Sequence, residues 1–484
     1  MCIIFTLFYQ KYVWIRKKTV TLHENTDNIH VMTRVHFIAI GGSAMHNLAI
    51  ALHLKGYIVS GSDDEIFDPA KSRLAKYGLL PDTIGWNPNR ITSDLDAVIL
   101  GMHARIDNPE LIRAKELGIK IFSYPEYLYE QSKHKKRVVI GGSHGKTTIT
   151  AMILHVLQYA GIKTDYMVGA QLEGFEVMVQ LSDDAGVMVL EGDEYLTSPI
   201  DRRPKFHLYN PDIALISGVA WDHINVFPTF EIYKEQFVQF ANLITPNGKL
   251  IYCANDNNVK EIGENCRADI ESIPYDIPSF VIEEGITKLL VGRDKVSLKI
   301  FGKHNLLNLM GAMNVCRCLG VSDEVFYNAI ASFKGASKRL ELVKKNDRTA
   351  VYKDFAHAPS KLKATISAMK EQYLNRKLVA CMELHTFSSL TDEFLSQYAG
   401  TMDVADEAIV YFNPHAIEHK KLPPLDPQRV LQAFGNDKIK IYTNSKQLVS
   451  YIIAMNWDNG NLLLMSSGNF DGVEFNELAN NIVK

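Results

Sequence analysis

Residues 138–150, VVIGGSHGKTTIT, join an apolar strand to a helix through a glycine turn. The common phosphate-binding pattern, G-x-x-x-x-G-K-[ST], needs a glycine at position 140, where this chain has Ile140. The turn instead runs from Gly142 to Lys146 and Thr147 with a shorter spacing. Glycines let backbone N–H groups point inward, and the N-terminus of the following helix attracts anions. Because strand, turn, lysine and helix are in register, we predict a nucleotide phosphate site rather than a chance glycine turn before a lysine.

The composition of the 484-residue chain is that of a globular protein with two or three domains. A net charge of -3 at pH 7 gives no reason to expect nucleic acid or an anionic membrane as a partner. The six cysteines include no C-x-x-C pair, which favours a reducing cytoplasm over a disulfide framework. The opening stretch MCIIFTLFYQKYVWIRKK, residues 1–18, is too short and too polar to span a bilayer. We expect no membrane insertion, and we interpret residues 1–32 as a mis-assigned start or an appendage.

Strand and helix patterns alternate along almost the whole chain, which predicts an α/β fold with mostly parallel sheets. Three such segments follow one another, and we place their boundaries at 33–133, 134–335 and 336–484. The first segment has apolar strands at 35–40, 57–62, 97–101 and 119–122.

Acidic residues follow the next apolar strand after the glycine turn. The stretch AGVMVLEGDEYL places Glu191, Asp193 and Glu194 at the end of this strand, where open α/β sheets bind ligands and where Mg²⁺ ligands are needed. A second strand ends in Asp222 and His223. The alternatives are a solvated acidic turn and a hydrogen-bonded structural histidine.

The first segment carries a weaker signal for a nucleotide. Its first strand leads into Gly41, Gly42 and Ser43, and Asp63 ends the next strand at the position typical of a ribose-binding acid. The full G-x-G-x-x-G pattern is absent. We therefore predict that this segment binds a nucleotide without specifying which one.

Six motifs together resemble the Mur ligase family: GSHGKTT, EGDEY, WDH, GKHNLLNLMGAM, KRLELV and KDFAHAP. They occur in that family's order and at its approximate spacing, and the resemblance covers residues 34–484. Mur ligases use the shortened G-x-x-G-K-[ST] loop and join amino acids or peptides to UDP-N-acetylmuramate. The resemblance implies a Rossmann-like N-terminal domain, a central P-loop ATPase-type domain with a parallel sheet and a Rossmann-like C-terminal domain.

The resemblance also implies roles for individual residues, with ATP as substrate and Mg²⁺ as metal. The implied catalytic residues are Lys146, Glu191 and His223, and the implied metal ligands are Thr147, Glu191 and His223. The implied ATP-binding residues are Gly142, Ser143, His144, Gly145, Lys146, Thr147, Thr148, Asn305, Asn308, Arg339 and Asp354. The implied residues for the UDP sugar are Gly41, Gly42, Ser43, Asp63 and His103. Asn305 could instead be a helix cap, and Arg339 a surface salt-bridge partner.

Three further stretches bear on the acceptor. EGDEYLTSPIDRRPKFHLYNP and MSSGNFDGV resemble the branch of the family that joins L-Ala-γ-D-Glu-meso-diaminopimelate to UDP-N-acetylmuramate in peptidoglycan recycling. In MELHTFSSLTDEF, His385 replaces arginines that could grip a carboxylate bidentately, which disfavours free alanine. We therefore expect an acceptor contact from His385. The family's D-H-x-D motif ends here in Asn225, and the alternatives are an L-alanine ligase and a catalytically silent nucleotide sensor.

Overall fold

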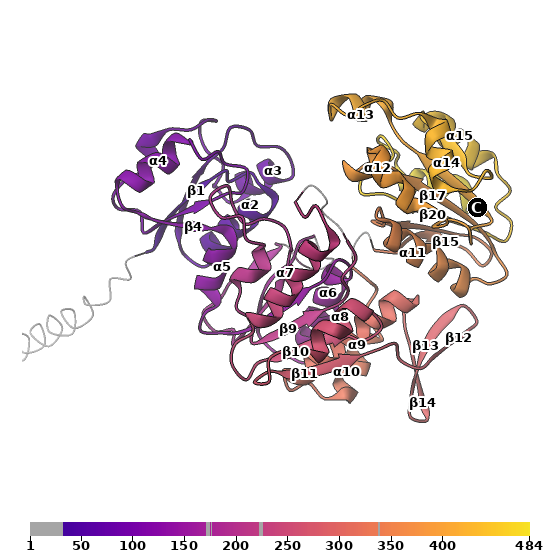
Figure 1. Ribbon diagram of the computed structural model, residues 1–484, viewed down its shortest axis with the longest axis horizontal. Helices are drawn as coiled ribbons and strands as arrows, with labels where there is room; N and C mark the ends of the chain where they lie inside the picture. Colours follow the sequence, from indigo (N-terminus) through magenta and orange to yellow (C-terminus); the bar gives the residue numbers. More distant parts are fainter. Residues whose placement is uncertain (1–31, 171–174, 176, 222–225, 337–338) are drawn as a thin grey trace, which may run out of the picture.

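The computed structural model describes residues 32–170, 175, 177–221, 226–336 and 339–484. Three α/β units follow one another along the chain (Figure 1). The N-terminal unit lies at the left of the view, the central unit below, and the C-terminal unit at the upper right. This arrangement confirms the predicted fold class. Residues 1–31 of the expected N-terminal extension lie outside the described residues.

The N-terminal unit is built on a parallel sheet in the order β2-β1-β3-β4. Its strands are β1 (Arg34–Ile38), β2 (Ile58–Ser62), β3 (Ala97–Leu100) and β4 (Lys120–Ser123), and its helices are α2 (Ser43–Leu54), α3 (Ala70–Lys76), α4 (Pro109–Glu116) and α5 (Tyr124–Ser132). The strand order reverses beside β1, so the loops after β1 and β3 open onto the crevice in which such sheets bind ligands. A capping box of Ser123 and Glu126 starts α5, which ends the unit.

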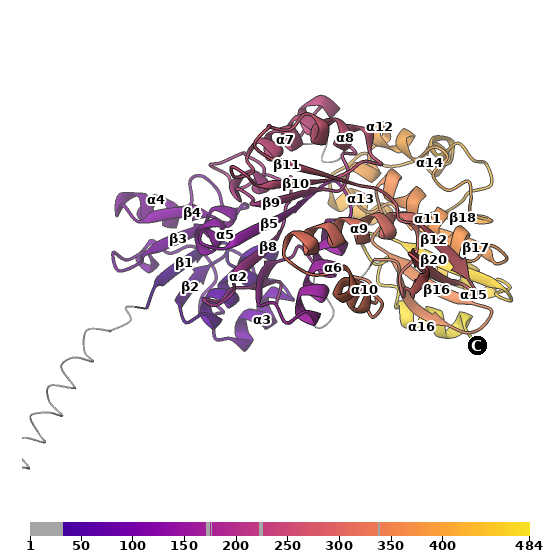
Figure 2. The same cartoon turned by 90° about the horizontal axis from the view of Figure 1, so that it is seen from below.

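The central unit has a seven-stranded sheet in the order β11-β10-β9-β5-β8-β6-β7, parallel except for β7. Its strands are β5 (Lys136–Gly141), β6 (Thr164–Met167), β7 (Val179–Gln180), β8 (Val187–Glu191), β9 (Ile213–Ile216), β10 (Lys249–Cys253) and β11 (Glu271–Tyr275). Figure 2 shows α7 (Phe230–Asn242) and α8 (Asn257–Glu264) on one side of this sheet. On the other side, α6 (Lys146–Tyr159) packs with α9 (Lys303–Cys318) and α10 (Asp323–Ile330).

A small antiparallel sheet follows the central sheet and projects from it (Figure 1). It consists of β12 (Phe280–Glu283), β13 (Ile286–Val291) and β14 (Asp294–Ser297). This sheet lies in the chain between β11 and α9, and Thr287 of β13 hydrogen-bonds Gln372 of α11 (Pro359–Gln372) in the C-terminal unit.

The C-terminal unit has a six-stranded sheet in the order β15-β16-β20-β17-β18-β19, in which only β15 is antiparallel to its neighbour. Its elements are β15 (Glu341–Lys345), β16 (Ala350–Asp354), α11 (Pro359–Gln372), β17 (Lys377–Glu383), α12 (Asp392–Leu395), β18 (Glu407–Tyr411), α13 (Pro414–His419), α14 (Pro427–Phe434), β19 (Lys440–Tyr442), α15 (Ser445–Ala454), β20 (Gly460–Met465) and α16 (Phe475–Ile482). Successive side chains of β17 enter two apolar cores: Leu378 and Ala380 pack on one face, Val379 and Cys381 on the other. Strands buried on both faces therefore read as continuous apolar runs.

None of the helices in the described part of the chain combines the length and apolarity needed to cross a bilayer.

Candidate active site

The loop between β5 and α6 accepts only glycine at two positions. Gly142 and Gly145 have φ angles of 132° and 83°, which L-residues rarely adopt. An added Cβ would also lie closer than 3.0 Å to the Oγ of Ser217 or the Oδ1 of Asn308, respectively. The backbone N–H of Ser143 donates to the carbonyl of Gly218 at 2.9 Å and fixes the loop to the end of β9. The result is a tight backbone cradle at the N-terminus of α6, which suits a phosphate.

Lys146, the first residue of α6, is held by two bonds. Its Nζ donates to the carbonyl oxygen of Gly142 at 2.7 Å and to Oε2 of Glu194 at 2.8 Å. Burial alone would lower the pKa of Lys146, but the carboxylates of Glu194, Asp193 and Glu191 outweigh burial and raise it. The ammonium therefore stays charged beside the loop. No sequence pattern pointed to Glu194 as the partner of Lys146, because the two residues lie 48 positions apart.

Glu191 ends β8 directly beside this loop. Its Oε1 accepts a hydrogen bond from the Thr147 hydroxyl at 2.7 Å, and its Oε2 accepts one from the backbone N–H of Gly169 at 2.7 Å. Burial raises the pKa of Glu191, and the charge of Asp193 adds to this. Asp193 itself lies 3.5 Å from the Nζ of Lys205. A hydroxyl and a carboxylate thus stand together at the phosphate loop, as hard oxygen ligands for Mg²⁺ would.

His223 was predicted as the remaining metal ligand, but it lies outside the described residues, as do Asp222 and Asn225. Among the residues that are described, no group of three or more His, Cys, Asp or Glu side chains is close enough to hold a metal. The predicted metal role of Thr147 and Glu191 therefore stays a prediction.

A cavity of about 690 Å³ opens in front of the phosphate loop, and all three units contribute to its wall. The sequence-predicted residues that line it are Ser43, Ser143, His144, Gly145, Lys146, Thr147, Thr148, Glu191, Asn305, Asn308, Arg339 and Asp354. Predicted residues as far apart in the sequence as Ser43 and Asp354 thus line one cavity. The wall also contains residues that the sequence analysis did not single out: Arg73, His304, Phe355, Ser360 and Lys361.

Two histidines in this wall are neutral at pH 7. Burial lowers the pKa of His144 to about 4, with a further contribution from the charge of Lys361. Burial also lowers the pKa of His304 to about 4, and His144 adds to this. The ring of His144 packs against Gly218, where an added Cβ would lie closer than 3.0 Å to the ring. These rings therefore bring shape and hydrogen-bonding atoms to the cavity but no positive charge.

The C-terminal unit adds Asp354 and Arg339. Oδ2 of Asp354 accepts the N–H of Leu340 at 2.8 Å, and Oδ1 accepts the N–H of Ala356 at 2.6 Å. The Arg339 guanidinium lies 4.7 Å from the centre of the Phe355 ring. Burial raises the pKa of Asp354, whereas the charge of Arg339 opposes this. Asp354 therefore fixes the backbone beside Arg339, and both residues line the larger cavity.

Asn305 and Asn308 lie in the first turns of α9. The Nδ2 of Asn305 donates to the carbonyl of Phe301 at 2.9 Å, whereas the N-cap position belongs to Gly302. Asn305 is therefore not the cap that we considered as an alternative. Both amides face the large cavity on the side of the phosphate loop.

A second cavity, of about 260 Å³, lies between the N-terminal and central units. Gly42, Ser43 and His103, three of the residues predicted for the UDP sugar, line it, and that role stays a prediction. Among the residues that the structure describes, four belong to the walls of both cavities: Ser43, Gly169, Met178 and Asp193. The two cavities therefore adjoin each other beside the acidic stretch.

Three family models match the chain in succession. They are the Mur ligase family, catalytic domain at residues 34–136, the Mur ligase middle domain at 140–316, and the Mur ligase, glutamate ligase domain at 338–468. A protein of Sulfurihydrogenibium sp. strain YO3AOP1, named UDP-N-acetylmuramate–L-alanine ligase, is 32% identical over 78% of this chain and 82% of its own length. The chain belongs to the Mur ligase family. Mur ligases are ATP-dependent enzymes that form amide or peptide bonds and use Mg²⁺, so the prediction of such a ligase is confirmed.

Other Mur ligases are similar over most of the chain. The UDP-N-acetylmuramate–L-alanine ligase of Carboxydothermus hydrogenoformans is 29% identical over 92% of this chain and 96% of its own length. The structure of a murein peptide ligase from Psychrobacter arcticus 273-4 matches with a TM-score of 0.61 at 22% identity, covering 93% of this chain and 98% of that one. The structure of a UDP-N-acetylmuramate–alanine ligase from Thermotoga maritima matches with a TM-score of 0.66 at 20% identity, covering 90% and 96%. The structural matches show the Mur ligase fold.

Gly41 and Asp63 of this Mur ligase lie behind the wall of the smaller cavity. The backbone N–H of Gly41 donates to Oδ2 of Asp63 at 2.6 Å, and burial raises the pKa of Asp63 to about 6. Neither residue lines either cavity. In the described structure Asp63 therefore holds the glycine turn.

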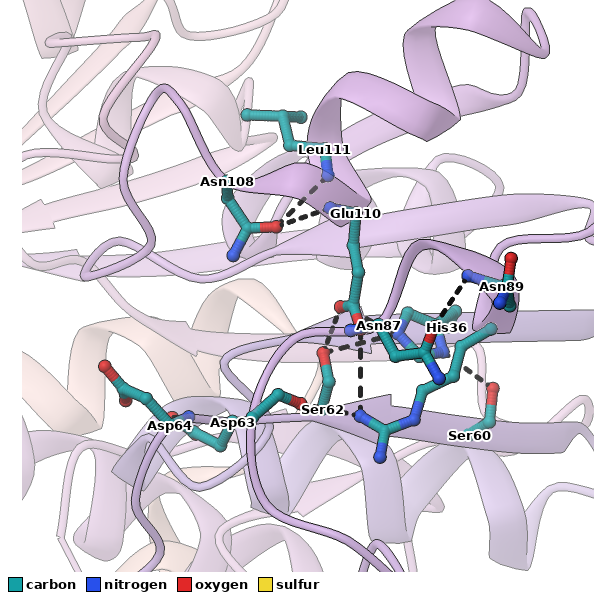
Figure 3. Close-up of polar contacts among 12 residues, drawn as sticks. His36, Ser60, Ser62, Asp63, Asp64, Asn87, Asn89, Asn108, Glu110 and Leu111 are labelled. Carbon is teal, nitrogen blue, oxygen red and sulfur yellow. Dashed lines mark hydrogen bonds and ion pairs between the residues drawn. The ribbon is translucent and has the colours of Figure 1, made fainter.

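A buried polar network includes Ser62, the residue that precedes Asp63 in the chain (Figure 3). Glu110, at the start of α4, accepts hydrogen bonds from the hydroxyl of Ser62 and, at 2.8 Å, from the backbone N–H of Asn87. The ring of His36 lies 3.4 Å from the same carboxylate and 2.9 Å from the Ser60 hydroxyl. His36, Ser62 and Glu110 are fully buried. The sequence analysis missed this network, and the polar His36 within an apolar strand was the only local signal of it.

His385 follows β17 and lines neither cavity. Its Nδ1 lies 3.6 Å from Oε1 of Glu383, which is buried, whereas the His385 side chain is 40% exposed. Oε2 of Glu383 also accepts the hydroxyl of Ser466 and, at 2.9 Å, the backbone N–H of Phe470. His385, the predicted acceptor residue, thus lies at the carboxyl end of the sheet beside the Glu383 carboxylate, which Ser466 at the end of β20 holds in place.

Proposed function

We propose that this Mur ligase joins UDP-N-acetylmuramate to the murein peptide L-Ala-γ-D-Glu-meso-diaminopimelate with consumption of ATP. The observation that carries the proposal is the junction of the two cavities at Ser43 and Asp193. A sugar nucleotide in the smaller cavity can extend its carboxylate through this junction to the phosphate loop. ATP and nucleotide sugars are cytoplasmic metabolites, so we place the reaction in the cytoplasm.

The larger cavity fits MgATP. The glycine cradle and the N-terminus of α6 suit the phosphates, and an added Cβ at Gly142 or Gly145 would fill the cradle. Thr147 and Glu191, with His223 as the predicted third group, would hold Mg²⁺. The metal supplies charge neutralisation for the phosphates. Asn305 and Asn308 would contact the adenine and Asp354 the ribose.

The reaction has two steps. A carboxylate oxygen of the sugar attacks the γ-phosphorus, the bond to the bridging oxygen breaks, and ADP leaves with the electron pair. The amine of the acceptor then attacks the acyl carbon, loses a proton, and phosphate leaves. Positioning and charge neutralisation dominate such phosphoryl transfers, and Lys146 of the central unit and Arg339 of the C-terminal unit would supply positive charge. When ATP binds, Lys146 would give up its hydrogen bond to Glu194 and donate to the phosphates instead.

The acceptor assignment rests on the end of β17. Residues 384–391, LHTFSSLT, contain no arginine, so this stretch offers no bidentate guanidinium to the carboxylate of free alanine. His385, whose Nδ1 lies 3.6 Å from Oε1 of Glu383, would offer a single hydrogen-bond donor to a longer peptide. L-Alanine is the second candidate, because the named relatives at 29% and 32% identity are L-alanine ligases.

The test is phosphate release by the purified protein with ATP, Mg²⁺ and UDP-N-acetylmuramate, with L-alanine or the tripeptide as acceptor. We expect turnover with the tripeptide and a product of the corresponding mass. Turnover with alanine alone would overturn the peptide assignment. No turnover with either acceptor, together with tight ADP binding, would favour a nucleotide sensor.

A further inference from the structure

Arg73 brings a cation from the N-terminal unit into the ATP cavity. It lies on α3, which Figure 1 shows on the side of the N-terminal unit that faces the C-terminal unit. Its Nη1 donates to Oδ1 of Asn47 at 3.4 Å, and its side chain lines the larger cavity. No motif of the sequence pointed to this residue.

Asn47 ties Arg73 to the junction between the two cavities. Asn47 is fully buried; its Nδ2 donates to the carbonyl of Ser43 at 2.7 Å, and its Oδ1 accepts the N–H of Met178 at 3.2 Å. Ser43 and Met178 are among the residues that line both cavities. The position of the guanidinium is thus set relative to the place where a sugar carboxylate would meet the phosphate loop.

The charges in the cavity wall favour an anion at this position. In the part of the chain that the structure describes, four cationic side chains line the larger cavity: Arg73, Lys146, Arg339 and Lys361. Three carboxylates face them: Glu191, Asp193 and Asp354. Arg73 is the cation that comes from the unit holding the predicted UDP-sugar residues, and Ser43 of that unit is in the same wall.

We propose that Arg73 binds the carboxylate of the sugar nucleotide and then the acyl phosphate formed from it. A planar guanidinium with five donors matches both a carboxylate and a phosphate. As the carboxylate oxygen forms its bond to the γ-phosphorus and ADP leaves, Arg73 stabilises the charge and exchanges no proton. The inference rests on the proposed function for the identity of the sugar nucleotide, but it does not depend on the acceptor.

Positional isotope exchange in ATP isolates this step. The enzyme, Mg²⁺ and UDP-N-acetylmuramate are incubated without acceptor, and movement of ¹⁸O from the β,γ bridge to non-bridging positions reports reversible acyl phosphate formation. Three variants are compared: Arg73→Gln, Arg73→Lys and Lys71→Gln. Lys71 lies on the same helix, is exposed and lines neither cavity, so it controls for loss of charge on α3. Binding of a fluorescent ADP analogue without sugar serves as the second readout.

We expect Arg73→Gln to slow the exchange roughly 100-fold, as removal of a single donor to a developing anion does, and to raise the KM of the sugar nucleotide. Arg73→Lys should recover part of the rate, because it keeps the charge but not the paired donors. Lys71→Gln should match the wild type, and ADP affinity should be unchanged in all variants.

Two results would overturn the inference while leaving the proposed function intact. One is wild-type exchange in Arg73→Gln. The other is an equal loss of ADP affinity in Arg73→Gln without sugar, which would make Arg73 an ATP ligand or a structural residue. Absence of exchange in the wild-type enzyme with UDP-N-acetylmuramate would instead refute the proposed sugar nucleotide and, with it, the ligand assigned to Arg73.

Discussion

Replacing Gly145 by alanine is expected to lower both stability and nucleotide affinity. The φ of Gly145 is 83°, and an L-residue in this left-handed conformation costs roughly 1–2 kcal/mol. An alanine Cβ would also lie closer than 3.0 Å to Oδ1 of Asn308, with Cγ of Asn308 at 3.2 Å. The Asn308 amide must therefore move away from the loop, and the adenine contact predicted for it must move as well.

Gly161→Ala is the matched control for the backbone strain. Gly161 follows the same helix with a φ of 69°, and an added Cβ there would meet nothing within 4 Å. For a domain of this size, the shared strain should lower Tm by about 2–4 °C per kcal/mol in both variants. Gly145→Ala should melt lower still, because only it has the clash with Asn308.

Binding of a fluorescent ADP analogue separates function from strain. Gly145→Ala should bind it at least about tenfold more weakly than Gly161→Ala, a difference of about 1.4 kcal/mol. The double variant Gly145→Ala/Asn308→Ala should regain the Tm of Gly161→Ala without regaining affinity. Equal ADP affinity in the two glycine variants would refute the assignment of this loop as the phosphate cradle.

Three further predictions concern the other units. Glu110→Gln should cost about 1–3 kcal/mol of unfolding free energy, because an amide leaves part of the buried network unsatisfied, whereas Glu116→Gln on the exposed end of α4 should be neutral in urea denaturation. The pKa of His304 is about 4 in the folded chain and near 6.5 when unfolded, so only the unfolded chain takes up this proton as pH falls from 6.5 to 4. The contribution of neutral His304 to the free energy of unfolding is therefore fully present above pH 6.5 and is lost as the pH falls below it. His304→Gln should thus show a smaller fall in Tm between pH 7.5 and pH 5 than the wild type. His385→Arg should raise the ratio of kcat/KM for L-alanine to kcat/KM for the tripeptide. His415→Arg, at an exposed position, is the control; an equal rise of this ratio in both variants would contradict an acceptor role for His385.

The phosphate loop was predictable because its determinants are contiguous. A buried strand, two glycines with positive φ and a lysine at the helix start all lie within residues 138–150, and each leaves a signature in sequence. The alternating strands and helices likewise predicted the fold class, because an apolar run bounded by polar turns marks a strand buried on both faces. Individual roles beyond the loop came from the resemblance to Mur ligases.

The contacts that build the rest of the site could not be predicted, because they join residues that are far apart in the sequence. Glu194 reaches Lys146 across 48 positions, and Glu110 reaches His36 across 74. Arg73 and Lys361 sit on amphipathic helices, where a basic residue is ordinarily solvated. Only the placement of the three units around one cavity distinguishes them from other basic residues.

Helix α11 shows how that placement is achieved. Its first turns contribute Ser360 and Lys361 to the cavity wall. At its other end, Oε1 of Gln372 accepts the hydroxyl of Thr287 at 2.9 Å, and its Nε2 donates to the carbonyl of Gly285 at 2.5 Å. Thr287 and Gln372 are both buried, so these bonds are costly to leave unmade. The small sheet β12–β14 therefore fixes the far end of the helix whose first turns contribute Ser360 and Lys361 to the larger cavity, so a segment remote from this cavity sets the position of part of its wall.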